Sequence, residues 1–142
     1  MDMEVLVRLA GIAQLALCVA SVFLPRALHF RDGLRSAPPL MRHMFWTYAG
    51  YIFAINLAIG LLSTLSPRLL LDGSMLAALV ASFIAVYWGA RMIIQFISFG
   101  LDAAETGAPY YRFADAGLKL LFTGLTVVYC LAAWCDWTRK IL

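Results

Sequence analysis

Apolar residues run through this chain in four long stretches, each holding few charges and each followed by a helix-breaking residue or the end of the chain. A helix needs about 20 consecutive, mostly apolar residues to cross the ~30 Å hydrocarbon core of a bilayer. Proline follows the first and second stretches, and glycine follows the third. The pattern therefore predicts four transmembrane helices, over residues 4–24, 44–65, 74–99 and 115–137.

The composition agrees with a membrane protein. Of the 142 residues, 63% are hydrophobic and 13% are charged, and the mean hydropathy is +0.85. Soluble domains are about 45–50% apolar and about 25% charged, so this excess is too large for a soluble core. The stretches are also about twice as long as a barrel strand and lack strict alternation. We therefore expect one all-α domain, residues 1–142: an integral membrane four-helix bundle of antiparallel, up-and-down helices.

The positive charges predict an orientation. Four spans place both termini on one side, together with the short connection between the second and third spans. That side holds four Lys and Arg residues and the side of the two long loops holds six, and these residues favour the cytoplasmic side. We expect a bacterial inner-membrane protein with cytoplasmic loops and both termini outside. The six residues are Arg26, Arg31, Arg35, Arg42, Arg112 and Lys119.

The connections predict three local features. The segment RALHFRDGLR mixes apolar residues with arginines, which is typical of a short helix lying in the headgroup layer. The pair Pro38-Pro39 favours an extended chain before the second span. The connection SPRLLLDGS is short, so we expect the second and third spans to form an antiparallel hairpin.

Small and polar residues predict which helix faces pack. Apolar surface alone does not drive helix association in lipid, whereas small side chains and interhelical hydrogen bonds do. Three spans carry such residues at helical spacing, and they predict a compact bundle. These residues are Gly11, Gln14, Cys18 and Ser21 in the first span, Ala49, Asn56, Gly60 and Ser63 in the second, and Lys119, Thr123, Thr126 and Cys130 in the fourth.

The third span places an arginine well inside its cytoplasmic half. Arg91, Gln95, Ser98 and Asp102 follow one another at spacings of four, three and four. A guanidinium left in lipid costs at least ~2.5–3.5 kcal/mol, so we expect Arg91 to turn into the bundle and find an acceptor. Asp115 is the preferred partner, because it begins the fourth span and a helix N-terminus stabilises its charge.

Two interpretations of Arg91 stay open. It fixes the register of the helices through an ion pair, or it faces a polar pocket or partner surface open to the cytoplasmic leaflet. Aromatic residues at the start of the second span form either an interfacial belt or a wall of that pocket. The candidate ligand-binding residues are Arg91, Gln95, Tyr87, Trp88, Arg42, Trp46, Tyr48 and Asp115.

The expected function is non-catalytic binding of an anionic lipid, an amphipathic small molecule or another membrane subunit. One alternative is a redox membrane anchor that binds haem b or quinone through His29 and His43, since imidazole is an axial haem ligand. A second alternative is a small membrane enzyme acting on a lipid or isoprenoid, although the chain has no nucleophile or phosphate-binding motif. No basic run suggests nucleic acid, and we predict no catalytic residue and no metal site. The expected partners are membrane lipids, other membrane subunits or further copies of the chain.

Overall fold

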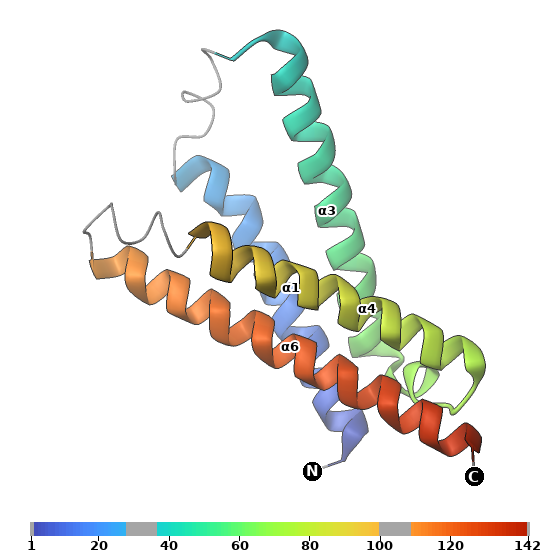
Figure 1. Cartoon of the computed structure of the whole chain (residues 1–142). Helices are drawn as coiled ribbons and strands as arrows, with labels where there is room; N and C mark the ends of the chain where they lie inside the picture. The colour runs from blue at the N-terminus through green and yellow to red at the C-terminus, as the bar shows by residue number, and fades with distance from the viewer. Residues whose placement is uncertain (1, 28–36, 100–108, 142) are drawn as a thin grey trace.

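The computed structural model describes residues 2–27, 37–99 and 109–141, and every element in this part is helical (Figure 1). Four helices are long and apolar enough to cross a membrane, over Met3–Phe23, Pro39–Leu65, Met75–Ile97 and Asp115–Arg139. These ranges confirm the four stretches that the sequence predicts. The elements in chain order are α1 (Met3–Ala27), α3 (Pro39–Leu65), the 3₁₀ turn η2 (Pro67–Leu70), α4 (Met75–Ile94), the π-helical turn η3 (Gln95–Phe99) and α6 (Pro109–Ile141).

Two helix boundaries differ from the expected ones, and both lie at prolines. The first helix does not stop at Pro25 but continues to Ala27, with the proline inside its last turn. The extended chain expected at Pro38-Pro39 is limited to Pro38, whose φ of −52° and ψ of 145° are extended. Pro39 occupies the first helical position of α3, where its missing N–H leaves no intrahelical bond unmade. The predicted interfacial helix falls mainly on residues outside the described part.

The helices pack as two pairs. The largest interface joins α4 to α6, the next joins α1 to α3, and a smaller one joins α1 to α6. The hairpin expected from the second and third spans is wrong, because α3 and α4 hardly touch although a short connection joins them. Neighbours in sequence therefore do not pair across that connection.

Each pair uses small residues for close approach. A Cβ added at Gly11 of α1 would lie 2.5 Å from Oγ1 of Thr64, and one at Gly60 of α3 would lie 2.9 Å from Cδ2 of Leu15. At Gly11 the added Cβ would also lie 2.8 Å from the backbone nitrogen of Thr64, so only glycine fits there, whereas at Gly60 the contact is with the flexible end of a side chain. On α4 the buried face is rich in alanine, which lets α6 pack closely. The buried alanines of α4 are Ala77, Ala78, Ala81 and Ala85.

The helices converge at one end and spread apart at the other (Figure 1). Both chain termini lie at the convergent end, beside the connection from α3 to α4. At the opposite end, the first half of α3 stands away from α4, and nearly all its side chains are exposed from Leu40 to Ile55. The compact packing that the sequence predicts is thus limited to the convergent part of the assembly. We call that part the termini end and the opposite part the spread end.

Candidate functional site

Polar side chains meet in the middle of the assembly. Gln14 of α1 is fully buried, and its Nε2 donates to the carbonyl oxygen of Asn56 on α3 at 3.0 Å. The hydroxyl of Tyr129 on α6 lies 2.7 Å from Oγ of Ser63 and donates to Oε1 of Gln14 at 3.4 Å. The hydroxyl of Tyr87 on α4 donates to Oδ1 of Asn56 at 3.2 Å. These five residues, which we call the polar node, connect all four helices.

The seam between α4 and α6 carries two reciprocal cation–π contacts at the spread end. The guanidinium carbon of Arg91 on α4 lies 5.8 Å from the ring centroid of Phe122 on α6. In the opposite sense, Nζ of Lys119 on α6 lies 5.5 Å from the ring centroid of Phe96 in η3. Each helix therefore places a cation over an aromatic face of its partner, which is an attractive arrangement.

Asp115 does not pair with Arg91, and that expectation is wrong. Its Oδ1 accepts a hydrogen bond from Nε2 of Gln95 at 2.8 Å, and its Oδ2 lies 2.6 Å from Nζ of Lys119. The acid is satisfied by its own helix and by η3. Within the described ranges Arg91 has no acidic partner.

Gln95 reaches Asp115 from the start of the π-helical turn. Its backbone N–H bonds to the carbonyl oxygens of both Arg91 and Met92, which is where the α-helical pattern of α4 gives way to the wider turn η3. Gln95 is only 5% exposed. Single π-turns inside helices are frequent at functional sites, and this one lies one turn from Arg91.

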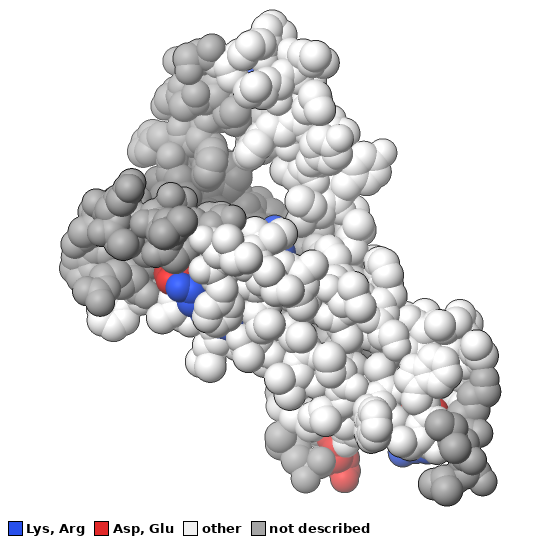
Figure 2. All heavy atoms as spheres, viewed as in Figure 1, with Lys and Arg blue, Asp and Glu red and all other residues white. Residues whose placement is uncertain are grey.

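Arg91 occupies the packing face of α4 and is nevertheless exposed. Trp88 and Gln95, three residues before and four after it, are both buried, and residues at these spacings share a helix face. The guanidinium remains accessible because the facing helices have spread: residues 19–23 of α1 and 40–48 of α3 are themselves exposed. The space-filling view shows a Lys or Arg surface in the recess between α3 and α4 (Figure 2). Arg91 therefore faces the inside of the assembly where that inside is open.

Trp88 contributes an unpaired donor close to Arg91. Its side chain is fully buried, and its ring centroid lies 5.4 Å from that of Phe122. The indole Nε1 has no hydrogen-bond partner in the described part of the chain. Trp88 and Arg91 thus contact the same aromatic ring, and both retain donors without acceptors.

The other predicted site residues are not brought to Arg91. Arg42, Trp46 and Tyr48 are exposed on the projecting first half of α3. Trp46 packs edge-on against its neighbour Phe45, with ring centroids 5.5 Å apart. His43 is exposed on the same segment, and His29 lies outside the described residues, so the haem alternative stays a prediction. Groups of three or more His, Cys, Asp or Glu residues that suit a metal ion do not occur among the described residues.

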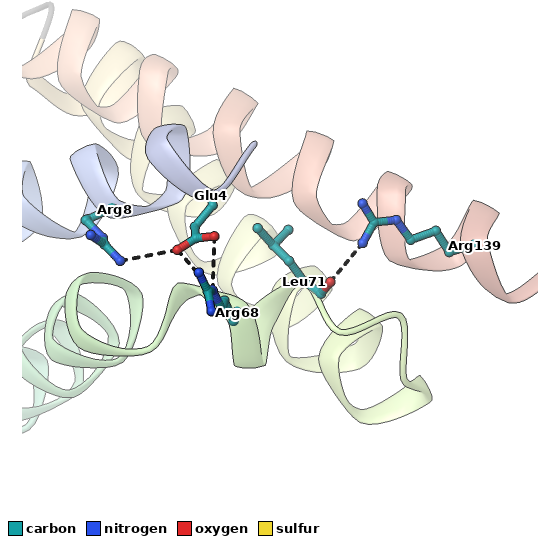
Figure 3. A network of polar contacts seen from close by, with 5 residues as sticks. All are labelled: Glu4, Arg8, Arg68, Leu71 and Arg139. Carbon is teal, nitrogen blue, oxygen red and sulfur yellow. Dashed lines mark hydrogen bonds and ion pairs between the residues drawn. The ribbon is translucent and has the colours of Figure 1, made fainter. Parts of the chain in front are cut away.

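The termini end carries a second polar network (Figure 3). Glu4 of α1 accepts from Nε of Arg68 at 3.2 and 3.3 Å and from Arg8 at 3.3 Å. Nη1 of Arg139 on α6 donates to the carbonyl oxygen of Leu71 at 2.9 Å. An open hollow of about 580 Å³ borders this network. Its lining residues are Asp2, Met3, Glu4, Arg68, Leu71, Asp72 and Arg139.

Asp136 of α6 secures the connection before α4. The side chain is fully buried, its Oδ1 accepts from the backbone N–H of Gly73 at 3.1 Å, and its Oδ2 has no partner among the described residues. Gly73 has a φ of +75°, which favours glycine. In the same turn, hydrogen bonds from the hydroxyl and the backbone N–H of Ser74 lower the pKa of Asp72.

Comparison with known proteins identifies no relative. No family model, no curated protein and no solved structure matches the chain.

Proposed function

We propose that this chain is a small, non-catalytic membrane protein that binds a membrane-embedded ligand or partner at its spread end, around Arg91. The single observation that supports the proposal is the position of this arginine. It lies on the packing face of α4, within a candidate span, yet it is exposed and has no acidic partner in the described ranges. Intramembrane ionisable residues mark ligand or ion sites by default.

The energetics favour an external acceptor. Inserting an arginine at the centre of a spanning helix costs ~2.5–3.5 kcal/mol on insertion scales. The contact with Phe122 returns about 0.5–2 kcal/mol, and it engages the face of the guanidinium and not its N–H groups. Those donors still lack acceptors among the described residues. A ligand or partner that supplies an oxygen acceptor in the recess completes the site.

In this proposal the long loops are cytoplasmic and the site opens to the inner leaflet of a bacterial inner membrane. The support is the charge count of six Lys and Arg residues on the loop side against four on the other. Anionic lipid headgroups, amphipathic small molecules and other membrane subunits are the ligand classes that suit a cationic site at this depth.

Native mass spectrometry of the gently extracted protein tests the proposal. The wild type is compared with Arg91→Leu and with Arg68→Leu, which removes the same charge from an exposed site at the termini end. We expect a bound adduct on the wild type and on Arg68→Leu, and its loss from Arg91→Leu with helical content unchanged by circular dichroism. Equal adducts on all three proteins, or none on the wild type, would contradict a site at Arg91.

A further inference from the structure

We infer that the occupant of the spread end is a phospholipid with a net negative headgroup, whose phosphate oxygens accept from Arg91. This inference rests on the proposed function and adds the chemical class of the ligand. Three features support it: the charges on α3 and α4, the apolar surfaces of these helices and the unpaired N–H groups of Arg91.

Helices α3 and α4, with the turn η3, carry only positive charge. Residues 39–65 and 75–99, which form α3, α4 and η3, contain no Asp or Glu, and their charged residues are Arg42 and Arg91. The nearest acid on α6 that the structure describes, Asp115, is already bound by Lys119 and Gln95. A second copy of this surface would bring like charges together in a medium of low dielectric, which is unfavourable. An anionic occupant is complementary to it.

The surfaces around the cations suit acyl chains. On α3, Met41 and Ile52 lie on the face that carries Asn56 and are 59% and 38% exposed. On α4, Ile94 lies one turn after Arg91 on the same side and is 49% exposed. Figure 2 shows that this face is almost free of charged atoms outside the recess and the two ends. A ligand with one anionic group and long apolar chains matches both features, whereas a soluble anion matches only the first.

The donors define what the headgroup must offer. The N–H groups of Arg91 are exposed and lack acceptors in the described part of the chain, whereas the Nε1–H of Trp88 is buried beside Phe122 and out of reach of a headgroup. Charge-assisted hydrogen bonds to phosphate are short and strong. A phosphate with several oxygens satisfies more of these donors than a single carbonyl does. Arg91 lies about 6 residues, or ~9 Å, from the end of the candidate span at Ile97, so the headgroup sits below the usual interface.

The inference is tested by comparing the affinities of the protein for two lipids that differ only in the headgroup. The purified protein in neutral detergent is titrated with phosphatidylglycerol and, separately, with phosphatidylcholine of the same acyl chains, and binding is followed by native mass spectrometry. We expect the wild type to bind phosphatidylglycerol about tenfold more tightly, which corresponds to about 1.4 kcal/mol. Arg91→Leu should lose this preference, Arg91→Lys should keep part of it, and Arg68→Leu should keep it fully.

The outcomes separate this inference from the proposed function. Equal affinity for the two lipids, with both weakened by Arg91→Leu, would leave a site at Arg91 and overturn the anionic headgroup. If glycerol phosphate displaces phosphatidylglycerol at the concentration at which the lipid binds, the site recognises a soluble phosphate, and the inference of a lipid ligand is wrong. If a dimer that depends on Arg91 forms without lipid, the occupant of the spread end is a second copy of the chain, and the inference is wrong. Thermal unfolding in the same detergent shows whether each variant is folded.

Discussion

The hydroxyl oxygens of Ser63 and Tyr129 lie 2.7 Å apart, and both side chains are fully buried. The bond joins α3 to α6, two helices from different pairs. It therefore contributes to holding the two pairs together, which Gln14 reinforces through its own bonds to both helices.

Tyr129→Phe removes this hydroxyl with little change in shape. We expect a loss of about 1–2 kcal/mol of stability, because interhelical hydrogen bonds in membranes contribute about 0.6 kcal/mol on average and Gln14 Oε1 is left without a donor. Unfolding of the purified protein in mixed micelles measures the change. Tyr51→Phe is the matched control, since Tyr51 is 67% exposed. An equal effect of both substitutions would show that the polar node does not join the pairs.

Gly11→Ala tests the contact between α1 and α3. The added Cβ would lie 2.5 Å from Oγ1 and 2.8 Å from the backbone nitrogen of Thr64, and backbone cannot yield as a flexible side chain does. Overpacking of this kind costs about 1–3 kcal/mol. Gly124→Ala on α6 meets nothing within 4 Å and should be neutral or slightly stabilising. Thermal unfolding in detergent compares the two, and a similar melting temperature for both would refute the close approach.

Asp136→Asn and Asp136→Leu separate hydrogen bonding from charge at the termini end. Asparagine keeps an oxygen that accepts from the N–H of Gly73, so we expect a change within about 0.5 kcal/mol, whereas leucine leaves that N–H unpaired at a cost of about 1–3 kcal/mol. Chemical unfolding of each variant gives these values. A larger loss in the asparagine variant than in the leucine variant would mean that the negative charge itself is required.

The stability of the fold should depend on pH through Asp72, and the hydrogen bonds in its turn determine the direction of the change. Hydrogen bonds from the Ser74 hydroxyl and backbone N–H lower the pKa of Asp72 in the folded state. Its contribution to stability is therefore complete above the unfolded-state value of about 3.9 and is lost as the pH falls through the folded-state value. Asp72 is exposed, so the effect is small. Stability measured from pH 6 to pH 2 should fall less steeply in Asp72→Asn than in the wild type. If the two curves are parallel, the Asp72 carboxyl does not contribute to the pH dependence.

The length of the apolar stretches predicts the four helices well. The spacing of small and polar residues predicts the packing faces of α1 and α3 better than that of α6. The four helices follow from the apolar runs because a helix satisfies the hydrogen bonds of twenty consecutive backbone groups within its own segment. On α1 and α3 the predicted faces are correct at Gly11, Gln14, Asn56, Gly60 and Ser63, which are all buried. The glycines permit close approach, and the polar groups find partners on other helices.

The predicted face of α6 is only partly correct, because Lys119 and Thr126 lie beside α4 and η3 but Cys130 is exposed. Thr123 and Thr126 donate to the carbonyl oxygens of Lys119 and Phe122 in their own helix, so their polarity needs no neighbour. The buried face of α6 instead includes Phe122, Leu125, Tyr129 and Asp136. A tyrosine in the middle of a span was the available signal for Tyr129. The sequence also holds the signal for the pair of Asp115 with Lys119, because an acid four residues before a lysine on one helix forms a favourable ion pair.

The pairing of α1 with α3 and of α4 with α6 divides the chain at Asp72 and Gly73. A break there leaves the bond between Glu4 and Arg68 within the first fragment and the bond between Asp136 and Gly73 within the second. Each fragment keeps its own large interface, and the contacts that cross the cut include the polar node, the α1–α6 and η2–α4 contacts, the hydrogen bond from Ser74 to Asp72 and the bond from Arg139 to Leu71. The protein thus has the partition that fragment complementation requires, and co-expressed residues 1–72 and 73–142 are expected to reassemble without a covalent link.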